Sequence, residues 1–163
     1  MHVFIIAAIT ADGKIAKRND ELADWTSKED KDFFRARTKE AGVMVMGSTT
    51  FETIGKPLPG RRTIVLSRSK TYEGVEVTSE SPKEIVERLT KEGVRELAIC
   101  GGSRVYGMFM AAGVVTTLYL TLEPKVFGDG VPLFGEALDV QLSLKNVSKL
   151  NDASVLLEYA IIR

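Results

Sequence analysis

The sequence contains little of the two side chains that carry most metal and acid–base chemistry. It has one cysteine, Cys100, and one histidine, His2, among 163 residues. A single cysteine excludes an intrachain disulfide and a cysteine-based metal site. Because the one histidine stands directly after the first methionine, hydrolases built on histidine, zinc enzymes with several histidine ligands and histidine proton relays are not expected. Proton chemistry must therefore use carboxylates, tyrosine, lysine or water, and we expect no metal.

The chain also lacks a net charge. Lysine plus arginine and aspartate plus glutamate number 22 each, which leaves a formal net charge of +0 at pH 7. No overall field therefore attracts nucleic acid or an anionic membrane, and we expect neither as a partner. Hydrophobic residues make up 44% of the chain and charged residues 27%. This balance is typical of a globular protein and excludes a disordered one.

Long apolar runs are absent as well. The apolar segment Val3–Ile9 is too short to cross a bilayer, and no cleavage signal follows it. We interpret it as a buried first strand and expect a cytoplasmic location. No low-complexity linker or internal repeat interrupts the chain, so we expect one domain over residues 1–163.

Short apolar runs alternate with amphipathic segments. The runs predict strands buried on both faces, at Val3–Ile9, Val43–Met46, Thr63–Leu66, Leu97–Cys100 and Thr117–Thr121. The amphipathic segments predict helices, at Lys28–Glu40, Pro82–Glu92 and Arg104–Ala112. This alternation predicts an α/β domain with a central, mostly parallel sheet flanked by helices. Leu142–Ser148 and Ser154–Ile162 surround the turn signal Asn151-Asp152 and predict a C-terminal antiparallel hairpin, which makes the sheet mixed.

Ligands of such sheets bind beyond the carboxyl ends of the parallel strands. At one such end, Gly101 and Gly102 are followed at once by a helix. The glycines let the backbone approach a ligand, the helix N-terminus presents N–H groups to an anion, and Arg104 adds positive charge. The pattern is not the G-x-G-x-x-G fingerprint. It indicates either a dinucleotide diphosphate site or a tight turn without a ligand.

A second strand end, Gly47–Gly55, also opens a short polar helix. The loop after it contains two prolines and presents Arg61 and Arg62. Paired arginines either grip a carboxylate or phosphate bidentately or form a solvated surface pair.

The segment before the first helix contains a carboxylate with two interpretations. Thr26 with Glu29, or Ser27 with Asp30, forms a capping box. Asp30 and Phe34 are also four residues apart, so they share one helical face and suit a flat, polar heterocycle. Spacing alone leaves both interpretations open.

Together these segments resemble the dihydrofolate reductase family over nearly the whole chain. The clearest stretch runs from Val45-Met46-Gly47 through Thr50-Phe51-Glu52 and Ile54–Arg61 to Ile64-Val65-Leu66-Ser67. Gly101–Tyr106 is similar to the family's cofactor turn, in which a cis peptide joins the two glycines. Trp25 stands five residues before Asp30, which matches the spacing of the family's active-site tryptophan and acid. Ala7-Ala8 and Asp12–Ile15 resemble the first strand and the mobile active-site loop.

The resemblance implies a site for dihydrofolate and NADPH. Asp30 would hydrogen-bond the pterin and favour protonation of its imine nitrogen, Thr121 would hold Asp30, and Trp25 completes the catalytic set. Arg61 would pair with a substrate carboxylate. The implied substrate-binding residues are Ile6, Ala7, Phe34, Ile54, Leu58 and Arg61. The implied cofactor-binding residues are Ala8, Ile15, Gly47, Ser48, Thr49, Thr50, Ser67, Arg68, Gly101, Gly102, Ser103, Arg104, Val105 and Tyr106.

One departure from the family pattern bears on the cofactor. Ser48 stands where many members have an arginine for the cofactor's 2′-phosphate. A preference for NADPH then rests on Ser67 and Arg68, with Arg62 as a third candidate.

Two alternatives remain. The riboflavin-pathway ribosylamino-pyrimidine phosphate reductase has the same fold, and Ala11–Ala16 and Trp25–Ser27 are similar to it, whereas Pro57–Arg61 suits folate. A catalytically inactive nucleotide-binding module would bind cofactor without turnover.

The apolar segment Glu123–Phe134 resembles part of a thermophilic, dimeric branch of the family, and it either forms a homodimer surface or folds back on its own core.

Overall fold

The computed structural model describes residues 1–21 and 23–163. Its helices are α1 (Lys28–Ala41), α2 (Ser48–Ile54), α3 (Pro82–Lys91) and α4 (Ser103–Ala111). Its strands are β1 (His2–Ile9), β2 (Lys14–Ala16), β3 (Val43–Gly47), β4 (Arg62–Leu66), β5 (Glu76–Thr78), β6 (Glu96–Ile99), β7 (Thr117–Leu122), β8 (Val131–Pro132), β9 (Leu142–Lys149) and β10 (Val155–Ile161). None of the helices in the described ranges is long and apolar enough to cross a membrane.

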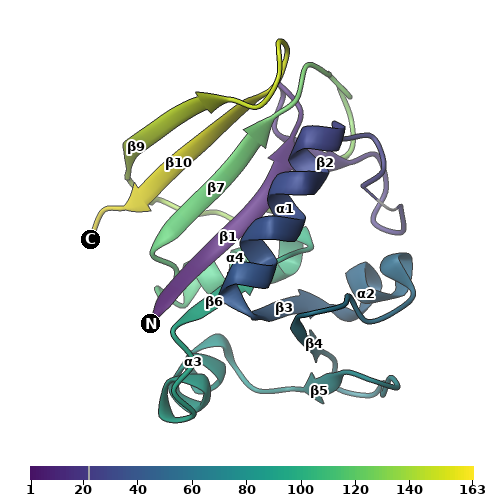
Figure 1. The fold of residues 1–163 in the computed structure, drawn as a ribbon, viewed down its shortest axis with the longest axis vertical. Coiled ribbons are helices and arrows are strands. Elements are labelled where there is room, and N and C mark those ends of the chain that lie inside the picture. The colour runs from purple at the N-terminus through teal and green to yellow at the C-terminus, as the bar shows by residue number, and fades with distance from the viewer. Residues whose placement is uncertain (22) are drawn as a thin grey trace.

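The sheet follows the order β5-β4-β3-β6-β1-β7-β10-β9 (Figure 1). The strands from β5 to β7 all run parallel to their neighbours, whereas β10 pairs antiparallel with both β7 and β9. The predicted fold class, a mixed and mostly parallel sheet with a C-terminal hairpin, is confirmed. β2 and β8 form a separate two-stranded ribbon.

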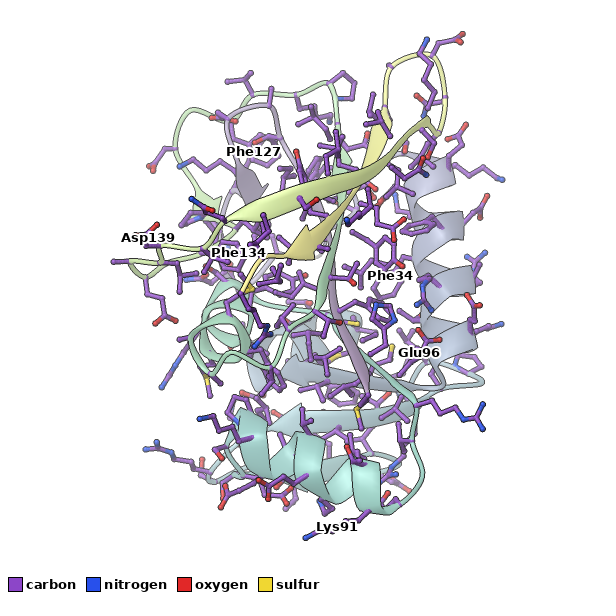
Figure 2. All side chains as sticks on the ribbon, turned by 90° about the vertical axis from the view of Figure 1, so that its left-hand side faces the viewer. Phe34, Lys91, Glu96, Phe127, Phe134 and Asp139 are labelled. Atoms are coloured by element: carbon purple, nitrogen blue, oxygen red, sulfur yellow. The ribbon has the colours of Figure 1, made fainter. Side chains whose placement is uncertain are left out.

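Alternate residues of β1 explain why helices cover both faces of the sheet. Val3 and Ile5 belong to the apolar cluster that includes side chains of α3 and α4. Phe4 and Ile6 belong to a second cluster, against which Phe34 of α1 packs. Because successive side chains of a strand point to opposite faces, each face needs its own helical layer. Figure 2 shows Phe34 in the layer between α1 and the sheet.

The predicted strand and helix ranges agree with the structure to within one or two residues. Three short strands, β2, β5 and β8, were not predicted. They have three, three and two residues, too few for a periodic pattern to be visible. Their pairing depends on partners elsewhere in the chain, as when Lys14 pairs with Pro132.

Much of the segment Glu123–Phe134 folds back on the protein. Phe127 packs edge-on against Trp25 with ring centroids 5.1 Å apart, and Leu133 and Phe134 pack against the core. Val126 is 70% exposed. The fold-back interpretation accounts for most of the apolar side chains, and a homodimer stays a prediction.

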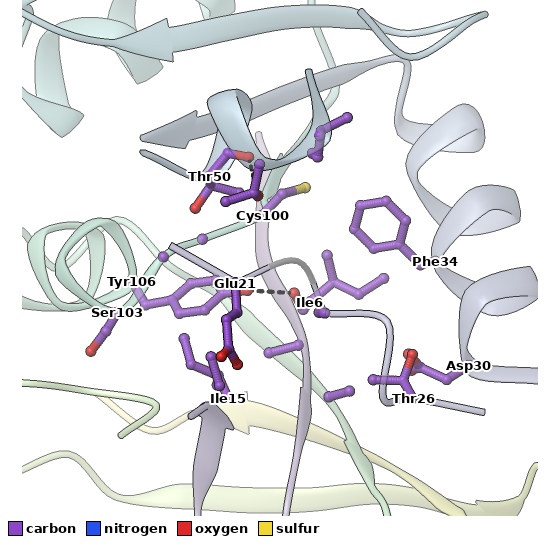
Figure 3. A pocket seen from close by; sticks show the side chains of 18 of the residues that line it. Ile6, Ile15, Glu21, Thr26, Asp30, Phe34, Thr50, Cys100, Ser103 and Tyr106 are labelled. Carbon is purple, nitrogen blue, oxygen red and sulfur yellow. Dashed lines mark hydrogen bonds between the residues drawn. The ribbon is translucent and has the colours of Figure 1, made fainter. Parts of the chain in front are cut away.

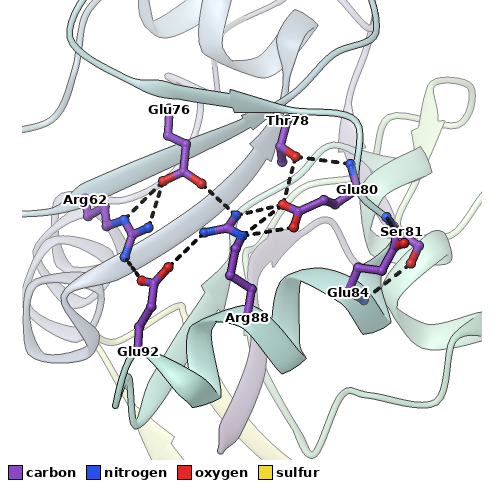
Figure 4. Close-up of polar contacts among 8 residues, drawn as sticks. All are labelled: Arg62, Glu76, Thr78, Glu80, Ser81, Glu84, Arg88 and Glu92. Carbon is purple, nitrogen blue, oxygen red and sulfur yellow. Dashed lines mark hydrogen bonds and ion pairs between the residues drawn. The ribbon is translucent and has the colours of Figure 1, made fainter.

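Arg88 stands at the centre of an ion-pair network that joins α3 to β4 and β5 (Figure 4). Its guanidinium contacts Glu76 at 2.6 Å, Glu80 at 2.7 Å and Glu92 at 3.2 Å. Arg62 bridges two of the same glutamates, Glu76 at 2.8 Å and Glu92 at 2.6 Å. The hydrogen bonds to Glu80 are the main cause that raises the pKa of Arg88 above its ordinary value.

We expect Arg88→Met to lower the free energy of unfolding by about 1 kcal/mol, because Glu80 then loses its cation and Glu76 and Glu92 share Arg62 alone. Urea unfolding at low and high salt measures the effect, which should shrink as salt screens the exposed charges. Lys91→Met, on the same helix, is the matched control and should change stability less. Equal losses in the two variants at both salt concentrations would argue against the network.

Candidate active site

Two glycine-ended turns lie side by side at the carboxyl edge of the sheet. β3 and β6 are neighbours, and the Gly47 N–H donates to the Gly101 carbonyl at 2.8 Å. The peptide bond between Gly101 and Gly102 is cis, as the resemblance implies. Gly101 has a φ of +110°, and a Cβ there would lie 3.3 Å from the Tyr106 hydroxyl. A side chain at this position would therefore be strained and crowded.

The helices that follow these turns begin without side-chain caps. Gly47 caps α2 and Gly102 caps α4, and neither supplies a side-chain acceptor for the first-turn N–H groups. The Ser103 Oγ, in the first turn of α4, is buried and has no hydrogen-bond partner within the described part of the chain. Free donors at a helix N-terminus next to an unpaired hydroxyl suit an anionic group such as a diphosphate.

Two cavities meet at these turns. One has a volume of about 420 Å³ and the other about 760 Å³, and Thr50, Gly102 and Ser103 line both. The first holds the predicted residues Ile6, Ala7, Ala8, Ile15, Asp30, Phe34, Thr50, Ile54, Leu58, Arg61, Gly101, Gly102, Ser103 and Tyr106. The second holds the predicted residues Gly47, Ser48, Thr49, Thr50, Ser67, Arg68, Gly102, Ser103, Arg104 and Val105. Every predicted substrate residue thus borders the first cavity.

The Asp30 side chain borders the first cavity and does not complete a capping box (Figure 3). Ser27 caps α1, because its Oγ accepts the Asp30 N–H at 3.2 Å. Burial raises the pKa of the Asp30 carboxyl, and the nearby charge of Glu123 acts in the same direction. Hydrogen bonds from the hydroxyls of Thr121 and Thr26 oppose this shift. The half-buried carboxyl therefore holds a proton more readily than an aspartate in water.

Thr121 and Trp25 do not border the first cavity, as far as the described residues show. Thr121 is 1% exposed and acts on the Asp30 carboxyl through its hydroxyl. The Trp25 indole N–H donates to the Ile15 carbonyl at 3.2 Å. This hydrogen bond holds Trp25 against β2.

The side chains of Arg61 and Arg62 make different contacts, although the two residues are adjacent in sequence. Arg61 borders the first cavity, where its Nη1 donates to Thr38 Oγ1 at 3.2 Å and its Nε donates to the Pro59 carbonyl at 3.0 Å. Burial lowers its pKa, and no carboxylate of the described residues forms an ion pair with it. Arg62 lies at the start of β4, in the ion-pair network. The Arg62 guanidinium is held by Glu76 and Glu92 and borders neither of the two cavities. Its contact with the cofactor's 2′-phosphate stays a prediction that this arrangement does not favour.

Tyr106 and Cys100 sit at the floor of the first cavity. The Tyr106 hydroxyl donates to the Ile6 carbonyl at 2.9 Å (Figure 3), which ties α4 to β1. Burial raises the pKa of the Cys100 thiol to about 12. Because the thiolate is the reactive form, Cys100 is a small apolar wall of the cavity.

Several residues around the two cavities were not predicted from the sequence. Some border the first cavity from β2 and the segment after it or from α1 and α2: Ala16, Asn19, Glu21, Ala23, Lys31, Arg35 and Thr53. Others border the second cavity near α3: Thr78, Glu80, Ser81 and Glu84. Glu123, which is 4% exposed, was also missed as a site residue. Strand alternation gives a signal for it, since Thr121 and Glu123 are two residues apart and point to the same side.

Known proteins of one family are similar to this chain over most of its length. The model of the family described as dihydrofolate reductase matches residues 2–134. Dihydrofolate reductase type A13 from Escherichia coli is 35% identical over 130 residues, which cover 78% of this chain and 77% of the relative. A dihydrofolate reductase from Enterococcus faecalis, solved in complex with NADP(H) and RAB-propyl, has 28% identity and a TM-score of 0.72, with 98% and 96% of the chains covered.

A second solved structure shares the fold at lower identity. It is described as a riboflavin biosynthesis protein from Shewanella sp. PV-4, with 22% identity, a TM-score of 0.84 and full coverage of both chains. At this identity the likeness concerns the arrangement of the backbone, which unrelated chemistries share. Backbone similarity therefore does not separate the two reductase classes, and the side chains of the site must do so.

Proposed function

Because the chain belongs to the dihydrofolate reductase family, we propose that it reduces 7,8-dihydrofolate to 5,6,7,8-tetrahydrofolate with NADPH. The observation that carries the proposal is the pairing of two groups in one apolar cavity. Asp30 supplies a half-buried carboxyl with a raised pKa, and Arg61 supplies a guanidinium that no described carboxylate neutralises. A pterin with a carboxylate tail needs both.

Asp30 is the catalytic residue of this scheme. Its carboxylate accepts hydrogen bonds from the pterin's amino group and ring nitrogen, and it favours protonation of the imine nitrogen that must gain a proton. Water delivers that proton. Thr121 orients the carboxyl by its hydroxyl, and Trp25 closes the adjacent loop on Ile15.

The walls of the first cavity orient the substrate. Ile6, Ala7, Phe34 and Ile54 enclose the pterin, and Leu58 lines the part that takes the aminobenzoyl group. Arg61 holds the carboxylate next to the amide. Holding two reactants in contact removes much of the entropic barrier to their reaction, so these apolar contacts contribute to the rate.

The second cavity holds the cofactor's phosphates and ribose. The N–H groups at the starts of α2 and α4, the Ser103 Oγ and Arg104 suit the diphosphate. Ala8 and Ile15 in the first cavity, with Thr50 shared by both cavities, would hold the nicotinamide. When bound, NADPH supplies the hydride. Because Thr50 and Gly102 line both cavities, a cofactor that extends from the second cavity into the first would reach the substrate there.

We expect Arg68→Ala to reduce the preference for NADPH over NADH by about tenfold, because Arg68 is the remaining cation for the 2′-phosphate once Arg62 is engaged elsewhere. Fluorescence titration with each cofactor measures the two affinities. Arg68→Ala should weaken NADPH binding and leave NADH binding nearly unchanged. If both affinities fall together, Arg68 contacts a part that the two cofactors share.

The first experiment is an assay of NADPH oxidation by the purified protein with 7,8-dihydrofolate and, in parallel, with the ribosylamino-pyrimidine phosphate. Turnover with dihydrofolate supports the proposal. Turnover with the pyrimidine alone would show that the fold is right and the substrate wrong. Tight NADPH binding without turnover on either substrate would favour the inactive nucleotide-binding module.

A further inference from the structure

A second carboxylate lies behind the catalytic one. Glu123 follows β7 directly and is 4% exposed. Its backbone N–H donates to the Ile9 carbonyl at 2.9 Å, which continues the pairing of β7 with β1. A buried carboxylate is costly unless its oxygens accept hydrogen bonds. Because its burial is costly, the position of the Glu123 carboxylate near Asp30 indicates a role in the site.

Two serine hydroxyls satisfy the Glu123 carboxylate. Ser27 Oγ donates to its Oε1 at 2.8 Å, and Ser154 Oγ donates to its Oε2 at 3.0 Å. The Ser27 Oγ accepts the Asp30 N–H, so its own hydrogen is free to point to Glu123. The result is a continuous chain from the Asp30 N–H through the Ser27 hydroxyl to Glu123, which fixes the first turn of α1.

The same contacts join the catalytic helix to the C-terminal hairpin. Ser154 precedes β10, and Asn151 Oδ1 accepts its backbone N–H at 2.7 Å. Asn151 Nδ2 in turn donates to Glu29 Oε2 of α1 at 3.4 Å. Glu123 thus lies between α1 and the hairpin turn, and a neutral hydrogen-bonding residue would serve as a simple linker there. A carboxylate adds a negative charge.

We propose that Glu123 is a positioning residue for Asp30: it fixes the start of α1 through Ser27, and its negative charge adds to that of the Asp30 carboxylate in favouring the protonated imine, which extends reduction to higher pH. The proposal rests on the proposed function only for the role of Asp30. The sign follows from Coulomb's law: a second negative charge stabilises a proton on the nearby imine, just as it stabilises the proton of Asp30 in the free protein.

The other groups around Asp30 do not supply the same effect. Lys31 on α1 lowers the pKa of Asp30, so it acts against Glu123. Tyr106 on α4 is buried, and burial raises its pKa well above the ordinary value, so it is neutral at physiological pH. Other charged side chains that border the cavity are Glu21, Arg35 and Arg61. Glu123 is the carboxylate that acts most clearly on Asp30.

The test is Glu123→Gln, which keeps the volume and removes the charge. Carbon-13 NMR of labelled aspartate follows the titration of Asp30 in the free protein, with the signal assigned by its loss in Asp30→Asn. Single-turnover hydride transfer to dihydrofolate is measured over the same pH range. We expect both midpoints to move to lower pH, and the rate above the midpoint to fall roughly three- to tenfold while the rate in acid changes little.

Two matched variants separate charge from structure. Ser154→Ala removes one hydrogen bond from Glu123 and keeps the charge, and Glu87→Gln removes an exposed glutamate of α3. Both should leave the Asp30 midpoint at its wild-type value. Equal rate losses at every pH in Glu123→Gln and Ser154→Ala, with an unchanged midpoint, would overturn the proposal. If the amide is not tolerated, the apolar variant Glu123→Met should move the midpoint in the same direction.

The titration also keeps this proposal separate from the proposed function, because it needs no turnover. A shifted Asp30 midpoint in a protein that does not reduce dihydrofolate would support the coupling and defeat the substrate assignment. Normal reduction with an unshifted midpoint would defeat the coupling alone.

Discussion

Asp30→Asn is expected to lower the rate of dihydrofolate reduction about 10²- to 10³-fold near neutral pH while leaving NADPH affinity nearly unchanged. The amide keeps the shape of the side chain and some hydrogen bonds to the pterin, but it has no charge to favour the protonated imine. The loss should be smallest in acid, where solution protonation of the substrate replaces the missing effect.

The same substitution is expected to stabilise the fold at neutral pH. The pKa of Asp30 is raised above its ordinary value of 3.8, with burial as the main cause. The folded state therefore binds this proton more tightly than the unfolded chain, and wild-type stability falls as pH rises from that value through the folded pKa. Asparagine carries no such proton, so the stability advantage of Asp30→Asn should appear at neutral pH and vanish in acid.

Stopped-flow hydride transfer and urea unfolding, each over a range of pH, measure the two effects. Asp32→Asn is the matched control, since Asp32 lies on the same helix and pairs at the surface with Lys28 and Arg35. It should leave both profiles nearly unchanged. An Asp30→Asn protein that is inactive and also less stable at neutral pH would show that Asp30 mainly holds the fold.

Arg61→Ala is expected to raise KM for dihydrofolate about 100-fold and to change kcat little. A guanidinium pairs with a carboxylate through two charge-assisted hydrogen bonds, which contribute equally to ground-state and transition-state binding when the carboxylate lies far from the reacting ring. Arg61→Lys should raise KM less than Arg61→Ala does, because lysine keeps the positive charge but cannot form the two parallel hydrogen bonds of a guanidinium.

Arg62→Ala is a close control for this variant. Arg62 is the next residue, yet its guanidinium is held by Glu76 and Glu92, so KM should stay near the wild-type value. A 7,8-dihydropterin without the carboxylate tail provides a second check, because Arg61→Ala and wild type should reduce it equally well. Equal KM values for dihydrofolate in Arg61→Ala and wild type would place the carboxylate elsewhere.

The elements that the sequence predicts well are those in which the local pattern and the tertiary environment agree. β1 is apolar at nearly every position because helices cover both faces, and the hairpin is marked by Asn151, whose Oδ1 accepts the Ala153 and Ser154 N–H groups. β5 lies at the sheet edge and is partly exposed along its length. Its sequence resembles that of a loop because only its pairing with β4 makes it a strand.

The site also contains features that local sequence patterns predict and features that depend on tertiary contacts. The two glycine turns are visible in sequence, because a strand ending in glycine and a helix start are both local signals. The orientation of Asp30 is not, since Ser27 offers the same carboxyl a place in a capping box. Contacts with Thr121 and the cavity decide it. The different roles of Arg61 and Arg62 are also beyond local patterns, because they depend on glutamates at positions 76 and 92.

The strand order has a consequence for how the chain reaches this structure. β1 is made before both of its partners, β6 and β7, whose residues lie about ninety or more positions later. Contacts between such distant residues form slowly, because a long loop must close before either pairing contributes stability. During synthesis, residues of β1 therefore remain without strand partners until most of the chain has emerged, and the apolar strand at the centre of the finished sheet is the one most in need of protection from aggregation.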